Sequence, residues 1–169
     1  MKQLKYIINY YVNMDSIDEF FNIGVKIDNQ KLIIEFVATG NSITELRKLM
    51  FLKKFEEILN QMNNDKIETF CFVFILNKGK MPTNFSFMND VSNIFLKYQP
   101  ILLKKLNFSI IQYKSNMVYT FFRVLKKFYS PIRPLYLCQN SEDVKICIHD
   151  SEKRKKFPDL TAKIKKKQL

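Results

Sequence analysis

The stretch that most constrains the fold is an unbroken apolar run near the middle of the chain. From Phe70 to Leu76 it contains no polar side chain. Its aromatic and β-branched residues suit a pleated strand, and the run is too short to span a membrane. A strand without polar positions is covered on both faces, which requires helices above and below it. We therefore expect an α/β fold in which this run is a central strand.

The length of the chain bounds the number of domains. With 169 residues, 47% of them hydrophobic, the chain can bury one sizeable core. We expect a single α/β domain over residues 1–149, followed by a basic, flexible tail over residues 150–169. The beginning of the sequence has no apolar stretch of signal-peptide length, and no run is long enough for a membrane span. The expected location is the cytoplasm, with peripheral membrane attachment and a nuclear location left open.

The cysteines predict no disulfide framework. Cys71 lies in the central run, whereas Cys138 and Cys147 are nine positions apart, and none belongs to a CxxC pair. Their number is odd, which does not suit complete pairing. We expect three buried free thiols that behave as small apolar side chains.

The remaining elements follow from apolar periodicity and from end signals. Residues 24–28 and 31–38 flank a short polar turn and predict a β-hairpin. Strands are also expected over 5–12, 107–113 and 135–138. Helices are expected over 15–21, 43–63, 88–98, 101–106, 115–129 and 141–148. This alternation predicts one mixed, mainly parallel sheet flanked by helices, with the hairpin at its start.

The helix predicted over residues 43–63 has a capping box in Ser42 and Glu45. Its apolar stripe is expected to face the core and its charged residues to face mostly solvent. The stripe comprises Ile43, Leu46, Leu49, Met50, Phe55, Ile58, Leu59 and Met62, and the charged residues are Arg47, Lys48, Lys54, Glu56 and Glu57. After the central strand, a loop is expected over residues 77–83. Because ligands usually bind at the carboxyl ends of parallel strands, any ligand should meet that loop.

The net charge of +12 is concentrated in the C-terminal half. No acidic residue occurs from Val91 to Ser141, and the last part of the chain is rich in lysine. Such a distribution is typical of a surface that faces phosphate, on lipid or on nucleic acid. The residues expected to contact an anionic surface are Arg123, Lys126, Lys127, Lys153, Arg154, Lys155 and Lys156.

The segment from Tyr98 to Leu137 resembles the C-terminal half of Sec14-like (CRAL-TRIO) domains. The likeness lies in the helix end at Tyr98-Gln99-Pro100, the strand over residues 108–113, the aromatic helix over 117–129 and the stretch over 130–137. In that family the Tyr and the Pro are adjacent, whereas Gln99 separates them here. The resemblance implies a compact, divergent member with a Sec14-like core over about residues 31–148. It implies lipid binding, with ligand contacts at Phe95, Tyr98, Phe121, Phe122 and Leu125.

A second, weaker resemblance covers the layout from Gly24 to Leu76, which is similar to a STAS domain. The regulatory Asp-x-Ser-Gly of that family is not reproduced by Asn77-Lys78-Gly79. The resemblance therefore implies a similar sheet without the phosphorylation switch.

No catalytic constellation is visible in the sequence. The single histidine, His149, precedes Asp150 without a nearby nucleophile motif and is expected to be solvated, and no metal-ligand spacing occurs. We expect no enzyme activity, cofactor or metal.

The leading hypothesis is a non-enzymatic Sec14-like module that binds lipid or associates peripherally with membranes. Its partner would be phospholipid or an anionic membrane surface. The alternative is a protein-interaction scaffold, or a STAS-like regulatory domain. A third hypothesis is nonspecific nucleic-acid binding through the basic tail.

Overall fold

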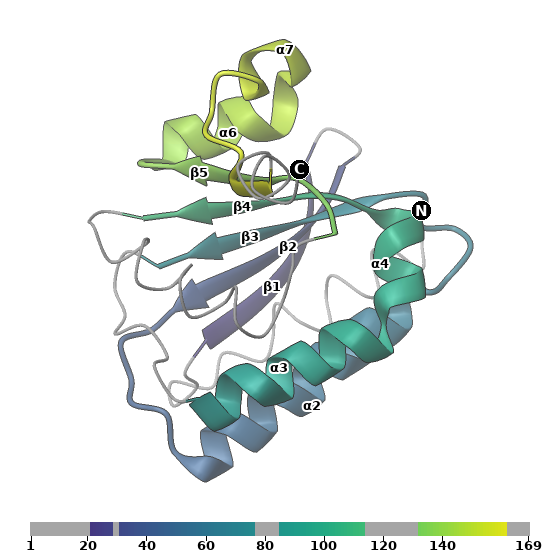
Figure 1. Ribbon diagram of the computed structural model, residues 1–169, viewed down its shortest axis with the longest axis vertical. Helices are drawn as coiled ribbons and strands as arrows, with labels where there is room; N and C mark the ends of the chain where they lie inside the picture. The colour runs from purple at the N-terminus through teal and green to yellow at the C-terminus, as the bar shows by residue number, and fades with distance from the viewer. Residues whose placement is uncertain (1–20, 29–30, 77–84, 114–131, 162–169) are drawn as a thin grey trace, which may run out of the picture.

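The computed structural model describes residues 21–28, 31–76, 85–113 and 132–161. In this part of the chain a five-stranded sheet carries helices on both faces (Figure 1). This confirms the predicted mixed, mainly parallel α/β architecture. The strands are β1 (Phe21–Asp28), β2 (Lys31–Ala38), β3 (Phe70–Ile75), β4 (Leu106–Gln112) and β5 (Leu135–Cys138). The helices are α2 (Glu45–Met62), α3 (Phe85–Lys97), α4 (Gln99–Lys105), α6 (Ser141–His149) and α7 (Ser151–Arg154).

The order of the strands in the sheet follows their order in the chain. The predicted hairpin is confirmed: β1 pairs with β2 in antiparallel fashion, and β2 to β5 are mutually parallel. The connections from β2 to β3 through α2, and from β3 to β4 through α3 and α4, pass over the same face of the sheet (Figure 1). Successive right-handed crossovers that advance in the same direction across a sheet lie on the same face of that sheet.

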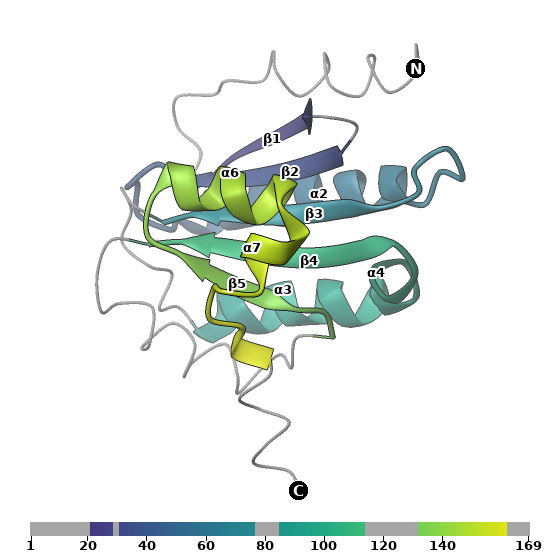
Figure 2. The same cartoon turned by 90° about the horizontal axis from the view of Figure 1, so that it is seen from above.

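The central strand β3 is covered on both faces, as its apolar run predicts. Phe70 and Phe72 belong to the core that the sheet shares with α2, α3 and α4. Cys71 and Val73, which alternate with them, pack in a second core under α6. Figure 2 shows α6 and α7 on the face opposite to α2 and α3. The alternation of side chains along a strand thus divides one apolar run between two cores.

Phenylalanine rings fill the core beneath α2 and α3. The ring of Phe36 on β2 stacks on Phe74 with centroids 4.8 Å apart, and meets Phe55 at 5.4 Å and Phe72 at 5.7 Å in edge contacts. Offset and edge-to-face arrangements are the favourable ones for aromatic pairs. The rings therefore fix the position of α2 over β2 and β3.

The start of α2 differs from the prediction. The N-cap is Thr44, whose hydroxyl accepts a hydrogen bond from the backbone N–H of Arg47 at 3.3 Å, and the helix begins at Glu45. The capping box assigned to Ser42 was therefore wrong by two residues. Thr44 has the extended backbone that an N-cap needs, and its side chain can satisfy the same type of unpaired N–H. The helix ends at Met62, within one residue of the expected end.

The buried face of α2 also differs from the predicted stripe. Phe55, Ile58, Leu59 and Met62 are buried as expected, but Leu46, Leu49 and Met50 are exposed. At about 100° per residue these three lie roughly opposite the buried face. The predicted stripe therefore combines two short apolar patterns that lie on different sides of the helix. Lys48 and Lys54, expected to face solvent, are buried instead, because Lys48 lies in line with Phe55 and Met62 on the core face and Lys54 lies at the margin of that face.

The carboxyl end of α2 is stabilised by a lysine from another helix. The last turn of α2 contains no basic residue. Lys105 of α4 is only 5% exposed, and its ammonium donates hydrogen bonds to the carbonyls of Met62 at 3.2 Å and Asn64 at 2.7 Å. A cation at this position donates to the Met62 carbonyl, one of those left without a partner inside the helix, and interacts favourably with the helix dipole.

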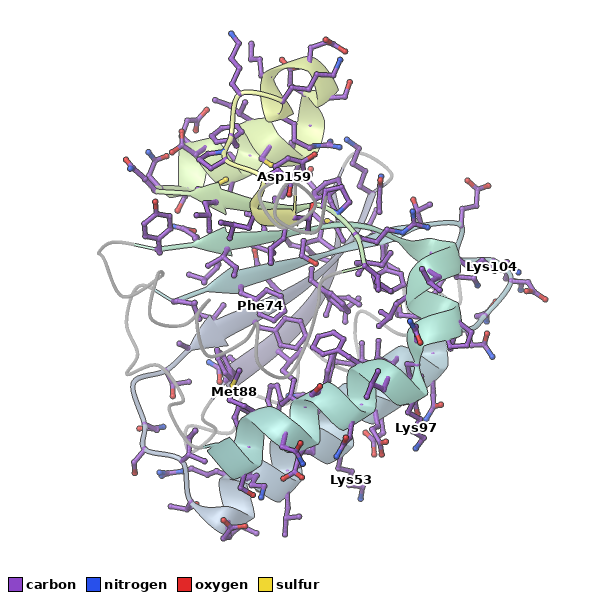
Figure 3. All side chains as sticks on the ribbon, viewed as in Figure 1. Lys53, Phe74, Met88, Lys97, Lys104 and Asp159 are labelled. Atoms are coloured by element: carbon purple, nitrogen blue, oxygen red, sulfur yellow. The ribbon has the colours of Figure 1, made fainter. Side chains whose placement is uncertain are left out.

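Part of the expected flexible tail packs on the sheet. The backbone N–H of Leu137 in β5 donates to the carbonyl of Pro158 at 3.1 Å, and that of Leu135 donates to the Asp159 carboxylate at 3.3 Å. Figure 3 shows Asp159 close to β5. Phe157 and Leu160 anchor this C-terminal segment (residues 155–161) by packing on the apolar clusters of the two sheet faces. Their apolar side chains explain why the segment does not extend from the domain.

Several predicted elements lie outside the described residues. They are the strand over 5–12, the helix over 15–21 apart from Phe21, the loop over 77–83 and the aromatic helix over 115–129. Phe21 itself is part of β1. No helix in the described ranges is both long enough and apolar enough to cross a bilayer.

We expect Lys105→Met to lower the free energy of unfolding by about 1–3 kcal/mol, because two carbonyls at the end of α2 lose a charged donor. Urea denaturation followed by circular dichroism would measure the change. Lys104→Met is the matched control, since Lys104 is the exposed neighbour in the same helix and should change stability by less than about 0.5 kcal/mol. Equal effects of the two substitutions would contradict the assigned role of Lys105.

Candidate functional site

Two of the five predicted ligand contacts are described, and both lie in the core. Phe95 of α3 is half-buried, with its ring 5.5 Å from that of Phe55 and 6.3 Å from that of Phe72. Tyr98 is buried, and its hydroxyl donates a hydrogen bond to Asn60 at 2.9 Å. These contacts join α3 to α2 and β3. Phe121, Phe122 and Leu125 lie outside the described residues.

The basic residues of the C-terminal segment and α7 are largely balanced by carboxylates. Lys153 lies 3.2 Å from Asp150, and Lys155 lies 2.8 Å from Glu152. Lys156 is exposed. The expected contacts Arg123, Lys126 and Lys127 lie outside the described residues. The described part of the predicted anionic-surface contact therefore carries little unbalanced positive charge.

Arg154 is used inside the fold. Its guanidinium lies 3.9 Å from the centre of the Phe108 ring and donates hydrogen bonds to the carbonyls of Cys147 and Ile148. Lys31 of β2 also donates to the carbonyl of Ile148. Both cations stabilise the carboxyl end of α6. Arg154 was expected to face an anionic surface, but its contacts are those of a structural residue.

An apolar cluster lies on the face of β3, β4 and β5 that α2 and α3 also cover, next to their phenylalanine core, against which Phe74 and Leu76 also pack. Three of its strand side chains are buried, three half-buried ones are at or after the carboxyl ends of β3 and β4, and the half-buried Leu160 of the C-terminal segment packs on it. Among the residues that the structure describes, α2, α3 and α4 contribute none to it. Figure 3 shows Phe74 at this place. We call this group the carboxyl-edge cluster: Phe74, Leu76, Ile111, Tyr113, Leu135 and Leu137.

The backbone around the carboxyl-edge cluster is satisfied by the sheet itself. The N–H of Leu76 donates to the carbonyl of Gln112, and that of Tyr113 donates to the carbonyl of Cys138, both at 3.0 Å. The Gln112 side chain lies on the other face, where its amide donates to the Ser141 hydroxyl at 3.3 Å. The cluster thus presents apolar side chains over backbone groups that are already paired, which suits an apolar ligand rather than a polar one.

The described crossovers run over one face of the sheet. In doubly wound sheets, ligands bind in a crevice where successive connections diverge to opposite faces. The described sheet has strands in sequential order, with its crossovers α2 and α3–α4 on one face. No such divergence occurs between the described connections. A ligand at the carboxyl edge would therefore lie against one face, as the carboxyl-edge cluster allows.

A polar cluster that sequence reasoning missed lies where α2 and α3 begin. The ammonium of Lys48 lies 2.7 Å from Asp90 and 2.9 Å from the Ser86 hydroxyl. Serine and lysine together can act as nucleophile and base only when the amine is neutral. The hydrogen bond from Lys48 to Asp90 raises the pKa of the ammonium, which keeps it charged. The cluster therefore joins the two helices through an ion pair and does not activate Ser86.

His149 is held in the fold. Its Nε2 lies 2.9 Å from the carboxylate of Asp28 at the end of β1, which links α6 to the hairpin. The expectation of a solvated histidine was therefore wrong, because the end of α6 reaches the last residue of β1. A carboxylate 121 positions away in the sequence leaves no local signal for such a contact.

The three cysteines are free and buried, as predicted, and lie in the core under α6. Burial raises the pKa of the Cys71 thiol to about 12. Hydrogen bonding between the thiols of Cys138 and Cys147, together with burial, raises the pKa of Cys138. Cys71 and Cys138 are therefore neutral thiols at physiological pH, without the character of nucleophiles. Within the described ranges, no group of three His, Cys, Asp or Glu side chains is arranged to hold a metal ion.

No protein-family model, curated protein or solved structure matches this chain.

The Cys71 pKa predicts a loss of stability in alkali. An unfolded thiol loses its proton near its ordinary pKa of 9.0, whereas folded Cys71 keeps it up to about 12. The contribution is thus complete below pH 9.0 and is lost as the pH rises toward the folded value. Between pH 7 and pH 10 the wild type should lose about 1.4 kcal/mol more than Cys71→Ala. Urea denaturation of both proteins at both pH values measures this difference, and equal losses would contradict it.

Proposed function

We propose that the chain is a non-enzymatic, Sec14-like module that binds the apolar part of a lipid against the carboxyl-edge cluster. The observation that carries this proposal is the cluster itself. It combines apolar side chains from three parallel strands, at the end of the sheet where ligands of open α/β folds usually lie. Its neighbouring backbone groups are paired, so recognition there would rest on apolar contact.

The sequence resemblance supports the same place. The segment that resembles Sec14-like domains, Tyr98 to Leu137, includes β4, β5 and the chain between them. Ile111, Leu135 and Leu137 of the cluster belong to these two strands. Phe121, Phe122 and Leu125 stay predicted ligand contacts from the chain between them. Arg123, Lys126 and Lys127 stay predicted contacts to an anionic surface.

The chemistry of the described polar groups favours binding over catalysis. Lys48 is held charged by Asp90, Cys71 is held as a neutral thiol, and His149 bonds Asp28. Each group has a structural contact that accounts for its position. The non-enzymatic part of the proposal rests on these contacts.

A protein-interaction scaffold is the second candidate, and one observation favours it. Leu46, Leu49 and Met50 form an exposed apolar stripe on the outside of α2. Exposed apolar side chains at helical spacing are a common feature of surfaces that bind another protein.

To test the lipid proposal, the full chain would be incubated with phosphatidylcholine vesicles, repurified and analysed by native mass spectrometry for bound phospholipid. Leu76→Trp should lower lipid occupancy about tenfold, or about 1.4 kcal/mol of binding free energy, because the larger side chain takes up space that the lipid would occupy at the carboxyl-edge cluster. Ile75→Trp is the matched control, since Ile75 is the adjacent residue, is also half-buried and packs on the opposite face.

Two results would contradict the proposal. One is a wild-type protein that carries no phospholipid after incubation. The other is an equal loss of lipid in Leu76→Trp and Ile75→Trp, which would place the effect in general stability. Circular dichroism of each variant shows whether it is folded before its lipid content is compared.

A further inference from the structure

The outer side of α3 and α4 carries two large apolar residues that are exposed to solvent. Leu96, in the last turn of α3, is 60% exposed, and Leu103 in α4 is 46% exposed. Exposed apolar side chains that stand together mark contact surfaces more often than single ones do. The question is therefore whether these two residues share a face.

Leu96 and Leu103 belong to two helices that meet at a bend, where the backbone of Tyr98 (φ −97°, ψ 11°) is not helical (Figure 1). The N–H of Tyr98 donates to the carbonyl of Ile94, and that of Leu102 donates to the carbonyl of Tyr98, both at 3.0 Å. The buried positions Ile94, Tyr98, Leu102 and Lys105 recur every three or four residues across this bend. Leu96 in α3 and Leu103 in α4 each lie on the side of their own helix that faces away from these buried residues. They therefore both lie on the outer side of this bent pair of helices.

A lysine follows each of these leucines. Lys97 and Lys104 are both exposed, and Figure 3 shows them directed away from the sheet. The chain contains no acidic residue from Val91 through α3 and α4. Glu56 of α2 pairs with Lys97 at 2.8 Å, and Arg133 adds a cation where it donates to the carbonyl of Leu103. The charge of this face is therefore positive.

We propose that the face formed by Leu96, Lys97, Leu103 and Lys104 docks on the surface of an anionic phospholipid bilayer. The two leucines enter the boundary between headgroups and acyl chains, and the lysines extend along it to meet phosphate. The inference rests on the proposed lipid binding, because docking would bring such a module to its ligand. Charge complementarity selects the partner: apolar side chains with lysines on one flank match an anionic interface.

A second exposed leucine pair on the same helical layer provides a comparison. Leu46 and Leu49 of α2 are 69% and 61% exposed, at least as much as Leu96 and Leu103. Glu45, an exposed acid, precedes Leu46 at the start of that helix. The two pairs therefore separate an effect of apolar exposure alone from an effect of the α3–α4 face.

The first experiment is co-sedimentation with vesicles made of equal amounts of phosphatidylserine and phosphatidylcholine, at physiological salt. The double substitution Leu96→Asn with Leu103→Asn should weaken vesicle binding about tenfold, because both inserted side chains become polar. The control Leu46→Asn with Leu49→Asn should bind as the wild type does. All these positions are exposed, so the variants are expected to remain folded, which circular dichroism would verify.

The second experiment measures the contribution of the lysines. Lys104→Gln should weaken binding to the same vesicles about fivefold, and Lys97→Gln should act in the same direction. Lys53→Gln, an exposed lysine on the outside of α2, is the control and should have no effect. Neither lysine substitution should change binding to vesicles of phosphatidylcholine alone.

Three results would overturn the proposal. They are no binding of the wild type to the anionic vesicles, equal losses in the two leucine variants, and equal losses in Lys104→Gln and Lys53→Gln. Bound phospholipid measured by native mass spectrometry separates this failure from failure of the proposed function. Lipid retained by a protein that does not sediment with vesicles would refute docking alone, whereas absence of bound lipid would refute lipid binding.

Discussion

The structure depends on covering both faces of β3. Its side chains alternate between a phenylalanine core under α2 and α3 and a smaller core under α6. Burial of each large apolar side chain contributes about 1.5–3 kcal/mol, and neither face of this strand contains a polar residue that tolerates water. A single helical layer would leave half of these residues exposed. Both layers are therefore required, and the positions of α2 and α6 follow from the strand between them.

Long cationic side chains stabilise the carboxyl ends of helices in both layers. Lys105 reaches the end of α2 from α4, and Arg154 and Lys31 reach the end of α6 from elements that pack beside it. Each places a charge where unpaired carbonyls and the helix dipole favour one. Part of the large positive charge of the chain is thus used inside the fold. The residues that remain for an external partner are fewer than the composition alone indicates.

The strands and their order as α/β units could be predicted because they depend on local patterns: apolar runs, a short polar turn and helix end signals. The buried face of α2 could not, because Leu46 and Met50 fit a helical spacing as well as Phe55 and Ile58 do. Which pattern faces the sheet is decided by packing.

The carboxyl-edge cluster was missed for a similar reason. Phe74 and Leu76 meet Ile111 and Leu135 only through the strand order and register, which no local signal contains. The contact of His149 with Asp28 likewise depends on tertiary structure.

The C-terminal segment also determines where the sheet stops. A sheet whose strands are added in chain order has a last strand with a row of unpaired backbone groups, and such an edge can recruit a strand from another molecule. Residues 155–161 run along β5 and take up the N–H groups of Leu135 and Leu137 through Asp159 and Pro158. Proline has no N–H to offer to a further strand. This short segment thus covers the edge of β5 and hinders its pairing with a strand of another molecule. A chain that ended at α7 would leave that edge open.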